Sequence, residues 1–349
     1  MSPQASVNST PRALPNSRRR GPARGLVAAA ALAVGLVSAG PALTVSAAAA
    51  QNAGSAFIAN NTLMVAGTNG SDVVALGADA TEVEVEFGND PADVQRFSLG
   101  DFTAISVSLG NGDDQFTEQS GVLVDKALTI DGGNGNDNIK TGDGIDSVSG
   151  GNGDDSVDAG RGNDSVFLGN GKDFFVWNPG EGSDTVDGGN GNEDVMQFNG
   201  ANVNELMSLS ANGSAAVFLR DIANIRMDMN DIEIFNLKAL GGTDTITVDN
   251  LEGTAIRHAN IDLSGSSGGP DQQADVVTVN GTNRADRVNV TAQGAQVDVS
   301  GLPAETQITG SETLDHLQVD TLDGNDTVNV APGVATLIGV AVDLGLGQH

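Results

Sequence analysis

Residues 132–176 read GGNGNDNIK TGDGIDSVS GGNGDDSVD AGRGNDSVF LGNGKDFFV, which is one nine-residue unit repeated without a gap. Trp177 and Asn178 interrupt the frame, and it resumes as PGEGSDTVD at 179–187 and GGNGNEDVM at 188–196. Every unit has glycine at positions 2 and 4, an acid at position 6 and a large apolar residue at position 8. A flexible linker would not keep the apolar position. The pattern predicts a turn and then a short strand with one inward side chain. The inward residues are Ile139, Val148, Val157, Val166, Phe175, Val186 and Val195.

The turn half of each unit has the chemistry of a hard-cation site. Glycine permits positive φ and lets the main chain approach an ion closely, because it has no Cβ. The acid at position 6 offers carboxylate oxygens and the turn offers carbonyl oxygens. Calcium takes about six to eight such ligands.

The tract resembles the hemolysin-type (RTX) calcium-binding repeat family, whose pattern is G-G-x-G-x-D-x-U-x with U a large apolar residue. The resemblance implies a parallel β-roll in which two units form one coil, so that every second acid lies on the same edge. Several calcium ions are then expected between stacked turns. One edge would carry Asp137, Asp155, Asp173 and Glu193, and the other Asp146, Asp164 and Asp184. Main-chain ligands are expected from Gly133, Gly135, Gly142, Gly144, Gly151, Gly153, Gly160, Gly162, Gly169 and Gly171. Glu193 departs from the pattern, being longer than aspartate.

Calcium is expected to be a folding ligand of this tract. One buried apolar side chain per strand offsets little of the conformational entropy lost when nine residues become ordered. Stacked carboxylates also repel one another. Bound calcium removes that repulsion and links the coils, so we expect disorder without calcium and order with it.

A longer repeat of about 40 residues flanks the tract, a period typical of solenoids, propellers or arrays. Strands led by an acid begin at Asp194, Glu233, Asp275 and Asp315, and each is followed by a short turn and a second such strand. The runs are rich in Val, Ile and Thr, which predicts an all-β chain.

We expect the flanks to continue a parallel solenoid, because Gly70–Val74, Gly112–Phe116 and Gly324–Val328 keep a shortened unit, G-x-D-x-U. A β-propeller is the alternative, since four short strands per repeat also make a blade and the turn at Gln293-Gly294 indicates a hairpin. The expected organisation is an N-terminal β-repeat part at 51–131, the calcium-binding roll at 132–196 and a C-terminal β-repeat part at 197–349.

The flanking acids are interpreted as turn residues, since the full unit is missing around them. Asp72, Asp114 and Asp326 keep a glycine two residues earlier, which leaves weak cation sites open. Asp286 lies close to Arg284 and Arg287, which favours a turn or salt-bridge role.

The first 50 residues have the features of an export signal. The basic stretch Ser17–Arg20 precedes an apolar run from Leu26 to Val37, and Pro41 and the Val45–Ala47 segment suit cleavage. We expect a secreted protein that meets calcium outside the cell, where calcium modules bind at about 10⁻⁴–10⁻³ M.

Charge and composition restrict the partners and the chemistry. The formal net charge is −30, which disfavours nucleic acid and anionic membranes. Calcium is the expected partner, with cell-surface or extracellular polysaccharide as a candidate, and no membrane insertion is expected once the signal is cleaved. The chain has no cysteine, and its histidines (His258, His316 and His349) lack metal-ligand spacing.

A structural or adhesive protein is therefore the leading expectation, and no catalytic residue is assigned. The alternative is a calcium-dependent carbohydrate-active enzyme, a polysaccharide lyase or epimerase on a β-helix, with Arg226 and Arg257 as candidate basic residues. Against it, the chain has no tyrosine and one tryptophan, whereas sugar sites use aromatic platforms.

Overall fold

The computed structural model describes residues 54–88, 93–119, 123 and 126–346. The expected export signal and His349 lie outside these residues. Within them the regular structure is β, apart from the short 3-10 turns η1 (Ile222–Asn224) and η2 (Val334–Thr336). No helix in this part of the chain is long and apolar enough to cross a membrane.

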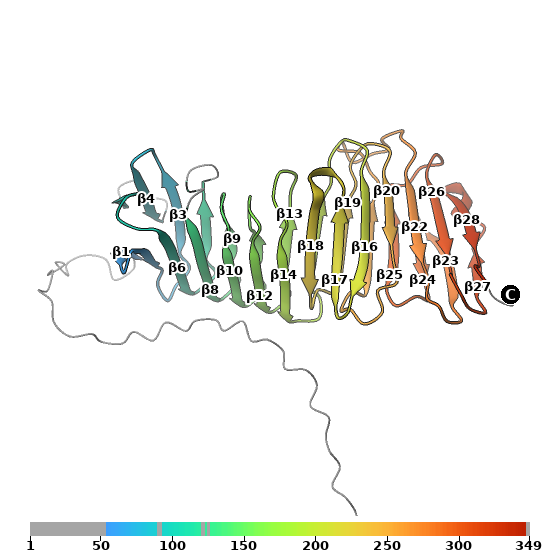
Figure 1. The fold of residues 1–349 in the computed structure, drawn as a ribbon, viewed down its shortest axis with the longest axis horizontal. Helices are drawn as coiled ribbons and strands as arrows, with labels where there is room; N and C mark the ends of the chain where they lie inside the picture. Colours follow the sequence, from blue (N-terminus) through green and yellow to red (C-terminus); the bar gives the residue numbers. More distant parts are fainter. Residues whose placement is uncertain (1–53, 89–92, 120–122, 124–125, 347–349) are drawn as a thin grey trace, which may run out of the picture. The chain divides into compact units, whose positions relative to one another are not determined.

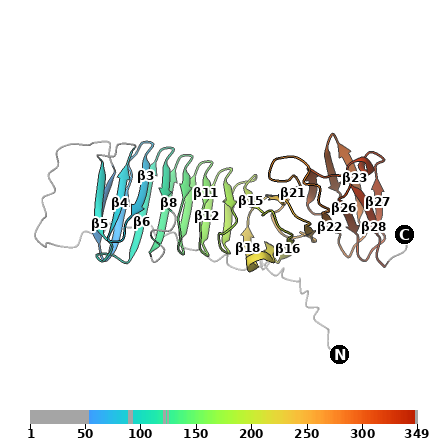
Figure 2. The same cartoon turned by 90° about the horizontal axis from the view of Figure 1, so that it is seen from above.

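The strands form two sheets of 14 strands each, which we call sheet A and sheet B (Figures 1 and 2). Sheet A has the order β1 (Ser55–Ala59), β2 (Thr62–Ala66), β6 (Ala104–Asn111), β8 (Ala127–Asn134), β10 (Ser147–Asn152), β12 (Ser165–Asn170), β14 (Thr185–Asn190), β18 (Ile225–Asn230), β17 (Ala215–Arg220), β16 (Leu206–Asn212), β20 (Thr245–Val248), β22 (Val276–Asn280), β26 (His316–Asp320) and β28 (Gly339–Asp343). Sheet B has the order β27 (Thr327–Val330), β23 (Arg287–Gln293), β24 (Gln296–Ser300), β25 (Glu305–Thr309), β21 (His258–Asp262), β19 (Ile234–Lys238), β15 (Val195–Asn199), β13 (Phe174–Trp177), β11 (Ser156–Asp158), β9 (Asn138–Lys140), β7 (Gln115–Glu118), β3 (Val73–Ala78), β4 (Glu82–Phe87) and β5 (Val94–Ser98).

In the nonapeptide tract the chain alternates between the two sheets, so that two units make one coil. Val148 of β10 pairs in parallel register with Ile130 of β8 and Val166 of β12, and all three side chains are buried. Sheet B repeats the arrangement, with Val157 of β11 facing the same core. The apolar position of each unit thus closes a thin two-sheet core, which confirms the parallel β-roll.

The flanking strands extend the same two sheets, so the propeller alternative is wrong. β20 and β22 add in parallel to sheet A, and β19 and β21 add in parallel to sheet B. The hairpin expected at Gln293-Gly294 does form, as β23 and β24, but it is part of an antiparallel meander within sheet B.

Antiparallel insertions explain why the flanks repeat more slowly than the tract. After β15 the chain enters sheet A as β16, returns as β17, and only then forms β18, which pairs in parallel with β14. β3–β4–β5 and β23–β24–β25 are the corresponding meanders of sheet B. Each meander lengthens one coil, so the acids that lead the flanking strands are separated by more than one nonapeptide pair.

The core widens where the tract meets the C-terminal part. Trp177 stacks on Phe198 with ring centroids 4.0 Å apart, and Phe218 and Phe235 continue the contact. All four rings are buried. Aromatic side chains contribute large buried areas, so this junction buries larger side chains than the valine-lined coils before it.

Candidate metal centre

The position-6 acids form two ladders, one along each edge of the roll. On the first edge the backbone N–H of Asp137 donates to Oδ1 of Asp155 at 2.8 Å, and Asp155 donates in the same way to Asp173. On the second edge Asp146 donates to Asp164 at 2.8 Å, and Asp164 to Asp184 at 2.9 Å. The structure therefore places these six aspartates on the two edges that the alternation of units predicts.

Each ladder aspartate keeps one oxygen without a protein partner. In every case Oδ1 accepts the ladder hydrogen bond, while Oδ2 is buried and accepts none from the described residues. A buried polar atom without a partner costs free energy, and far more so when it carries charge. These atoms are Oδ2 of Asp137, Asp146, Asp155, Asp164, Asp173 and Asp184.

Main-chain oxygens lie next to these unpartnered carboxylate oxygens. A Cβ on Gly132 would stand 2.5 Å from Oδ2 of Asp137 and 2.4 Å from the carbonyl oxygen of Gly150. Gly150 has the same relation to Asp155 and to the carbonyl of Leu168, at 2.5 Å each. Carboxylate and carbonyl oxygens are the ligands that calcium prefers, so the residues present fit calcium.

The turn glycines allow the coils to stack this closely. Gly135 and Gly153 adopt φ of 122° and 126°, a region that favours glycine. A Cβ on Gly153 would stand 2.1 Å from the carbonyl oxygen of Gly135 in the coil before it. Nine of the ten predicted glycines place their carbonyl oxygen against a glycine of the next coil in this way: Gly133, Gly135, Gly142, Gly144, Gly151, Gly153, Gly162, Gly169 and Gly171. The tenth, Gly160, is the glycine that lies against the carbonyl oxygen of Gly142.

No three His, Cys, Asp or Glu side chains among the described residues converge to hold an ion by themselves. A cation on either edge would therefore be held by one or two carboxylates together with carbonyl oxygens. Mixed ligand sets of this kind suit calcium, which tolerates flexible coordination.

Burial changes the proton affinity of the ladder carboxyls. It raises the pKa of Asp137 and Asp146 to about 6, of Asp155 and Asp184 to about 7, and of Asp164 to about 8. Neighbouring ladder carboxylates add to the shift of Asp155, because Asp137 and Asp173 carry the same charge. A positive charge would relieve both effects.

The structure corrects the last acid of the first edge. Asp173 donates its N–H to Asp194 at 2.9 Å, and Asp194 is fully buried with Oδ2 unpartnered. Glu193 is exposed and pairs with Lys172 outside the ladder. The assignment of Glu193 to the ladder is therefore wrong, and Asp194 takes that position.

Strand register explains this shift. Phe175 of β13 pairs with Met196, which is buried, while Val195 pairs with the half-buried Phe174. Side chains alternate across a strand, so a shift of one residue moves every side chain to the other face. The final unit has one more residue between its glycine turn and its acid, and Met196 replaces Val195 as the inward residue.

This register makes a direct prediction for calcium binding. Asp194→Asn is expected to remove a buried charged ligand and to lower calcium affinity at the end of the first edge. Glu193→Gln, the matched change one residue earlier, is expected to leave affinity unchanged, since that side chain is solvated. Isothermal titration calorimetry of calcium binding to both variants checks this. A larger loss of calcium affinity in Glu193→Gln than in Asp194→Asn would contradict the register.

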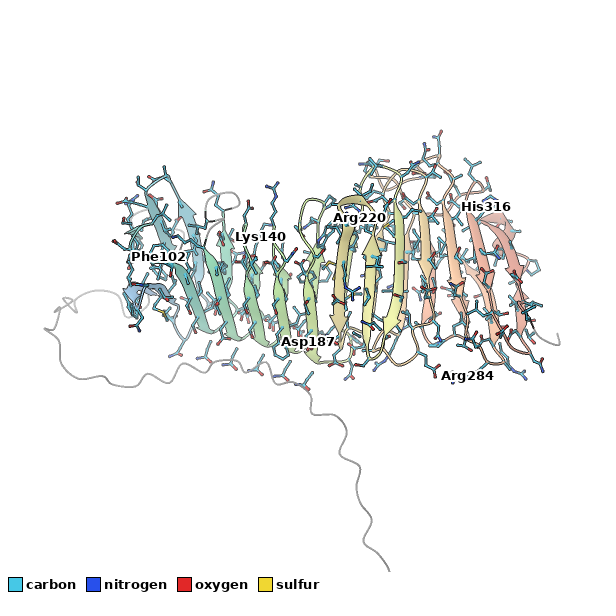
Figure 3. The ribbon with its side chains drawn as sticks, in the orientation of Figure 1. Phe102, Lys140, Asp187, Arg220, Arg284 and His316 are labelled. Atoms are coloured by element: carbon cyan, nitrogen blue, oxygen red, sulfur yellow. The ribbon has the colours of Figure 1, made fainter. Side chains whose placement is uncertain are left out.

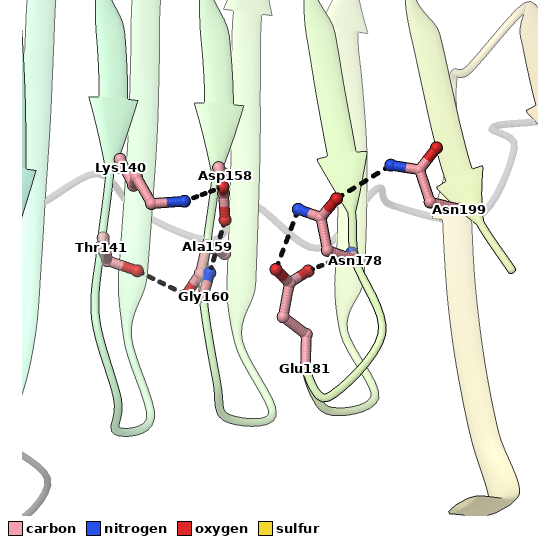
Figure 4. Close-up of polar contacts among 8 residues, drawn as sticks. All are labelled: Lys140, Thr141, Asp158, Ala159, Gly160, Asn178, Glu181 and Asn199. Carbon is pink, nitrogen blue, oxygen red and sulfur yellow. Dashed lines mark hydrogen bonds and ion pairs between the residues drawn. The ribbon is translucent and has the colours of Figure 1, made fainter. Parts of the chain in front are cut away.

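The two-residue insertion is held by its own contacts, as Figure 4 shows. The carboxylate of Glu181 accepts hydrogen bonds from the N–H and the side-chain amide of Asn178, at 2.6 and 3.0 Å. Asn199 in turn donates to Asn178 at 2.8 Å. In the coils before it, Lys140 pairs with Asp158 and Thr141 donates to the carbonyl of Ala159. The insertion thus forms a closed turn, and Asp184 keeps its place in the second ladder.

Sequence reasoning underestimated Asp114. Its N–H donates to Asp137 at 2.8 Å, it is 2% exposed, and its Oδ2 is unpartnered. The segment 109–117, LGNGDDQFT, keeps both glycines, the acid and the apolar residue of the unit. From the sequence, only the shortened unit Gly112–Phe116 was recognised, because residues 118–131 separate this segment from the tract.

Several other flanking acids are satisfied within the protein, whereas Oδ2 of Asp326 is buried and has no partner among the described residues. The carboxylate of Asp72 accepts hydrogen bonds from the N–H and the hydroxyl of Thr68. The carboxylate of Asp286 likewise accepts from the hydroxyl of Thr282 and, at 2.7 Å, from the N–H of Thr282. The turn role expected for Asp286 is the one that the structure shows. Glu205 pairs with the buried Arg220 and accepts from the N–H of Ala201 at 2.8 Å.

The residues considered for other chemistry do not form a site together. Arg226 lies on β18 of sheet A and pairs with Asp228, whereas Arg257 precedes β21 of sheet B. His316 is exposed at the surface of sheet A (Figure 3). Nδ1 of His258 lies 3.6 Å from Oε2 of Glu305.

The tract matches the family model of the RTX calcium-binding nonapeptide repeat (4 copies), at residues 131–166, 140–175 and 180–196. No curated protein matches the chain. The chain thus carries calcium-binding repeats within a parallel β-roll, and the roll extends on both sides of the matched residues.

Proposed function

We propose that this protein is a secreted calcium-binding β-roll whose role is structural or adhesive and not enzymatic. The observation that supports it best is the pair of carboxylate ladders with buried, unpartnered oxygens along the edges of the matched repeats. The features of residues 1–50 support export, and an extracellular polysaccharide is the proposed class of further partner.

The residues of the roll make calcium part of the fold. When bound, calcium supplies positive charge and oxygen coordination between stacked turns. The ladder aspartates hold their Oδ1 atoms against the main chain of the preceding coil and leave Oδ2 for the ion. The glycines bring carbonyl oxygens close to it, and the inward valines pack between the two sheets.

Export would separate the unfolded and folded states in space. Extracellular calcium modules bind at about 10⁻⁴–10⁻³ M, so such sites stay empty in the cell and fill outside. Without the ions, the charge of the ladders opposes the stacking of coils. The chain would then cross the membrane before its repeats become ordered.

Trp177 provides the test of this proposal. It is fully buried, its Nε1 donates to the carbonyl of Gly182 at 2.8 Å, and its ring stacks on Phe198. Calcium titration of the chain from residue 51 is expected to give a cooperative gain of β signal in circular dichroism together with a change in Trp177 fluorescence. Magnesium at the same concentration is the control. Absence of both changes up to about 10 mM calcium, well above the range of extracellular modules, would refute calcium-driven folding.

A further inference from the structure

A ladder acid outside the nonapeptide tract has the same environment as those within it. Asp244 is 0% exposed, and its Oδ2 has no partner among the described residues. Its Oδ1 accepts from the N–H of Glu205 at 2.9 Å, and its own N–H donates to Asp275 at 2.8 Å. Asp244 thus lies in a third ladder, at turns that lead into sheet A like those of the second edge.

The turn before Asp244 also keeps the geometry of the repeat. In the segment 239–247, ALGGTDTIT, Gly242 takes position 4, Asp244 position 6 and Ile246 position 8. Gly242 has φ of 137°, close to the 144° of Gly144 at the same position in the tract. Leu240 replaces the glycine of position 2 and still adopts φ of 71°. The strain of a leucine in this conformation shows that the coil holds the turn in the repeat shape.

Further oxygen donors surround this turn. Oδ2 of Asp271, from the loop after β21, accepts from the N–H of Gly242 at 3.2 Å. A Cβ on Gly241 would stand 3.0 Å from Oδ1 of Asn202 and 3.6 Å from Oδ2 of Asp271. Asp271 and Asp275 both add negative charge at Asp244. The turn therefore combines carboxylate and amide oxygens, and its nearest charges are all negative.

The neighbouring acids show how this chain satisfies a ladder carboxylate without an ion. Arg220 pairs with Glu205 in the coil below, and the N–H of Glu312 donates to Asp315 at 2.7 Å two coils above. On the other edge the N–H of Thr282 donates to Oδ2 of Asp286 at 2.7 Å. No described side chain plays that part for Oδ2 of Asp244.

We propose that Asp244, with the carboxylate of Asp271 and the side-chain amide oxygen of Asn202, holds a divalent cation, calcium by its oxygen ligands, at a site beyond the nonapeptide tract. This proposal rests on the proposed function, because it extends the same ladder chemistry to a turn that lacks the full motif. The ion would link the coil that carries Asn202 to the coil that carries Asp244.

Calcium stoichiometry by equilibrium dialysis of the chain from residue 51 tests the proposal. Asp244→Asn keeps the side-chain shape and is expected to bind one ion fewer than the parent. Asp286→Asn is the matched control, since Thr282 already satisfies that carboxylate, and it should bind the parent number. Hydrogen exchange gives a local readout, because calcium should protect β20 in the parent and not in Asp244→Asn.

Two comparisons separate the failure of this site from the failure of the proposed function. If Asp244→Asn binds the parent number of ions while Asp155→Asn binds fewer, the Asp244 site is refuted and the calcium-binding roll stands. If neither variant loses ions, both proposals fail. Should Asp244→Asn not fold, Asp271→Asn changes only the loop carboxylate, and an unaltered calcium isotherm for that variant would equally refute the site.

Discussion

Removal of calcium is expected to abolish hydrogen-exchange protection in strands β8 to β14 and to leave most of strands β16 to β28 protected. The two parts bury different amounts of apolar surface. β9 and β11 each bury one side chain, Ile139 and Val157, whereas β22 and β26 each bury two. Full burial of one such side chain stabilises by about 1.5–3 kcal/mol, so the coils that contain β19 to β26 have an advantage, although β27 and β28 bury no side chain.

Electrostatics act in the same direction. Seven ladder carboxylates of the tract have an unpartnered buried oxygen, those of Asp137, Asp146, Asp155, Asp164, Asp173, Asp184 and Asp194. In the C-terminal part fewer ladder acids are in this state: Arg220 neutralises Glu205, and the main chain or a threonine satisfies Asp315 and Asp286, while Asp244 and Asp326 keep an unpartnered oxygen. The Arg220 guanidinium also lies 5.5 Å from the Trp177 ring, at the boundary between the two parts. Protection should therefore change steeply near Trp177.

Exchange measured by mass spectrometry in chelator and in millimolar calcium, with magnesium as control, checks this expectation. A loss of protection that is uniform along the chain would mean that the roll unfolds as one unit and that the C-terminal coils depend on the same ions. Equal protection of β8 to β14 in both conditions would mean that the valine-lined coils fold without any ion.

The nonapeptide period, together with the resemblance to the RTX repeat, was enough to predict the roll and the two edges, because the resemblance implies that two units return the chain to the same edge. The period could not predict that Asp194, and not Glu193, takes the last ladder position on the first edge. That register depends on Met196 facing Phe175 across β13 and β15, which is a contact between coils and not a local preference.

The meanders were hidden for a related reason. β16 and β18 alternate apolar and polar residues as any sheet strand does, and β17 is a short apolar run, so their sequences do not reveal whether they pair with the next coil or with each other. The partner of Arg220 was likewise invisible, since the antiparallel pairing of β17 with β16 brings it to Glu205. Satisfied and unsatisfied ladder acids therefore look alike in sequence.

The raised carboxyl pKa values predict that protons and calcium compete for the same ladders. Burial raises the pKa of Asp155 to about 7 and of Asp164 to about 8, from an ordinary value of 3.8. In the calcium-free roll these groups favour the protonated form, so their contribution to stability is complete below about pH 4 and is lost as the pH rises through about 7 to 8. The calcium-free tract should be more ordered near pH 5 than near pH 8.5.

Calcium reverses this dependence, because it binds the ionised carboxylates. Affinity is expected to rise from about pH 6 to about pH 8 and then to level off, with protons released on binding in the lower part of the range. Calorimetry in two buffers of different ionisation enthalpy measures the protons released, and circular dichroism in metal-free buffer follows the calcium-free state. Asp286→Asn, whose carboxylate Thr282 already satisfies, should release as many protons as the parent, whereas Asp164→Asn should release fewer. A calcium affinity that stays constant between pH 6 and pH 8 would show that the buried ladder carboxyls are not the ligands.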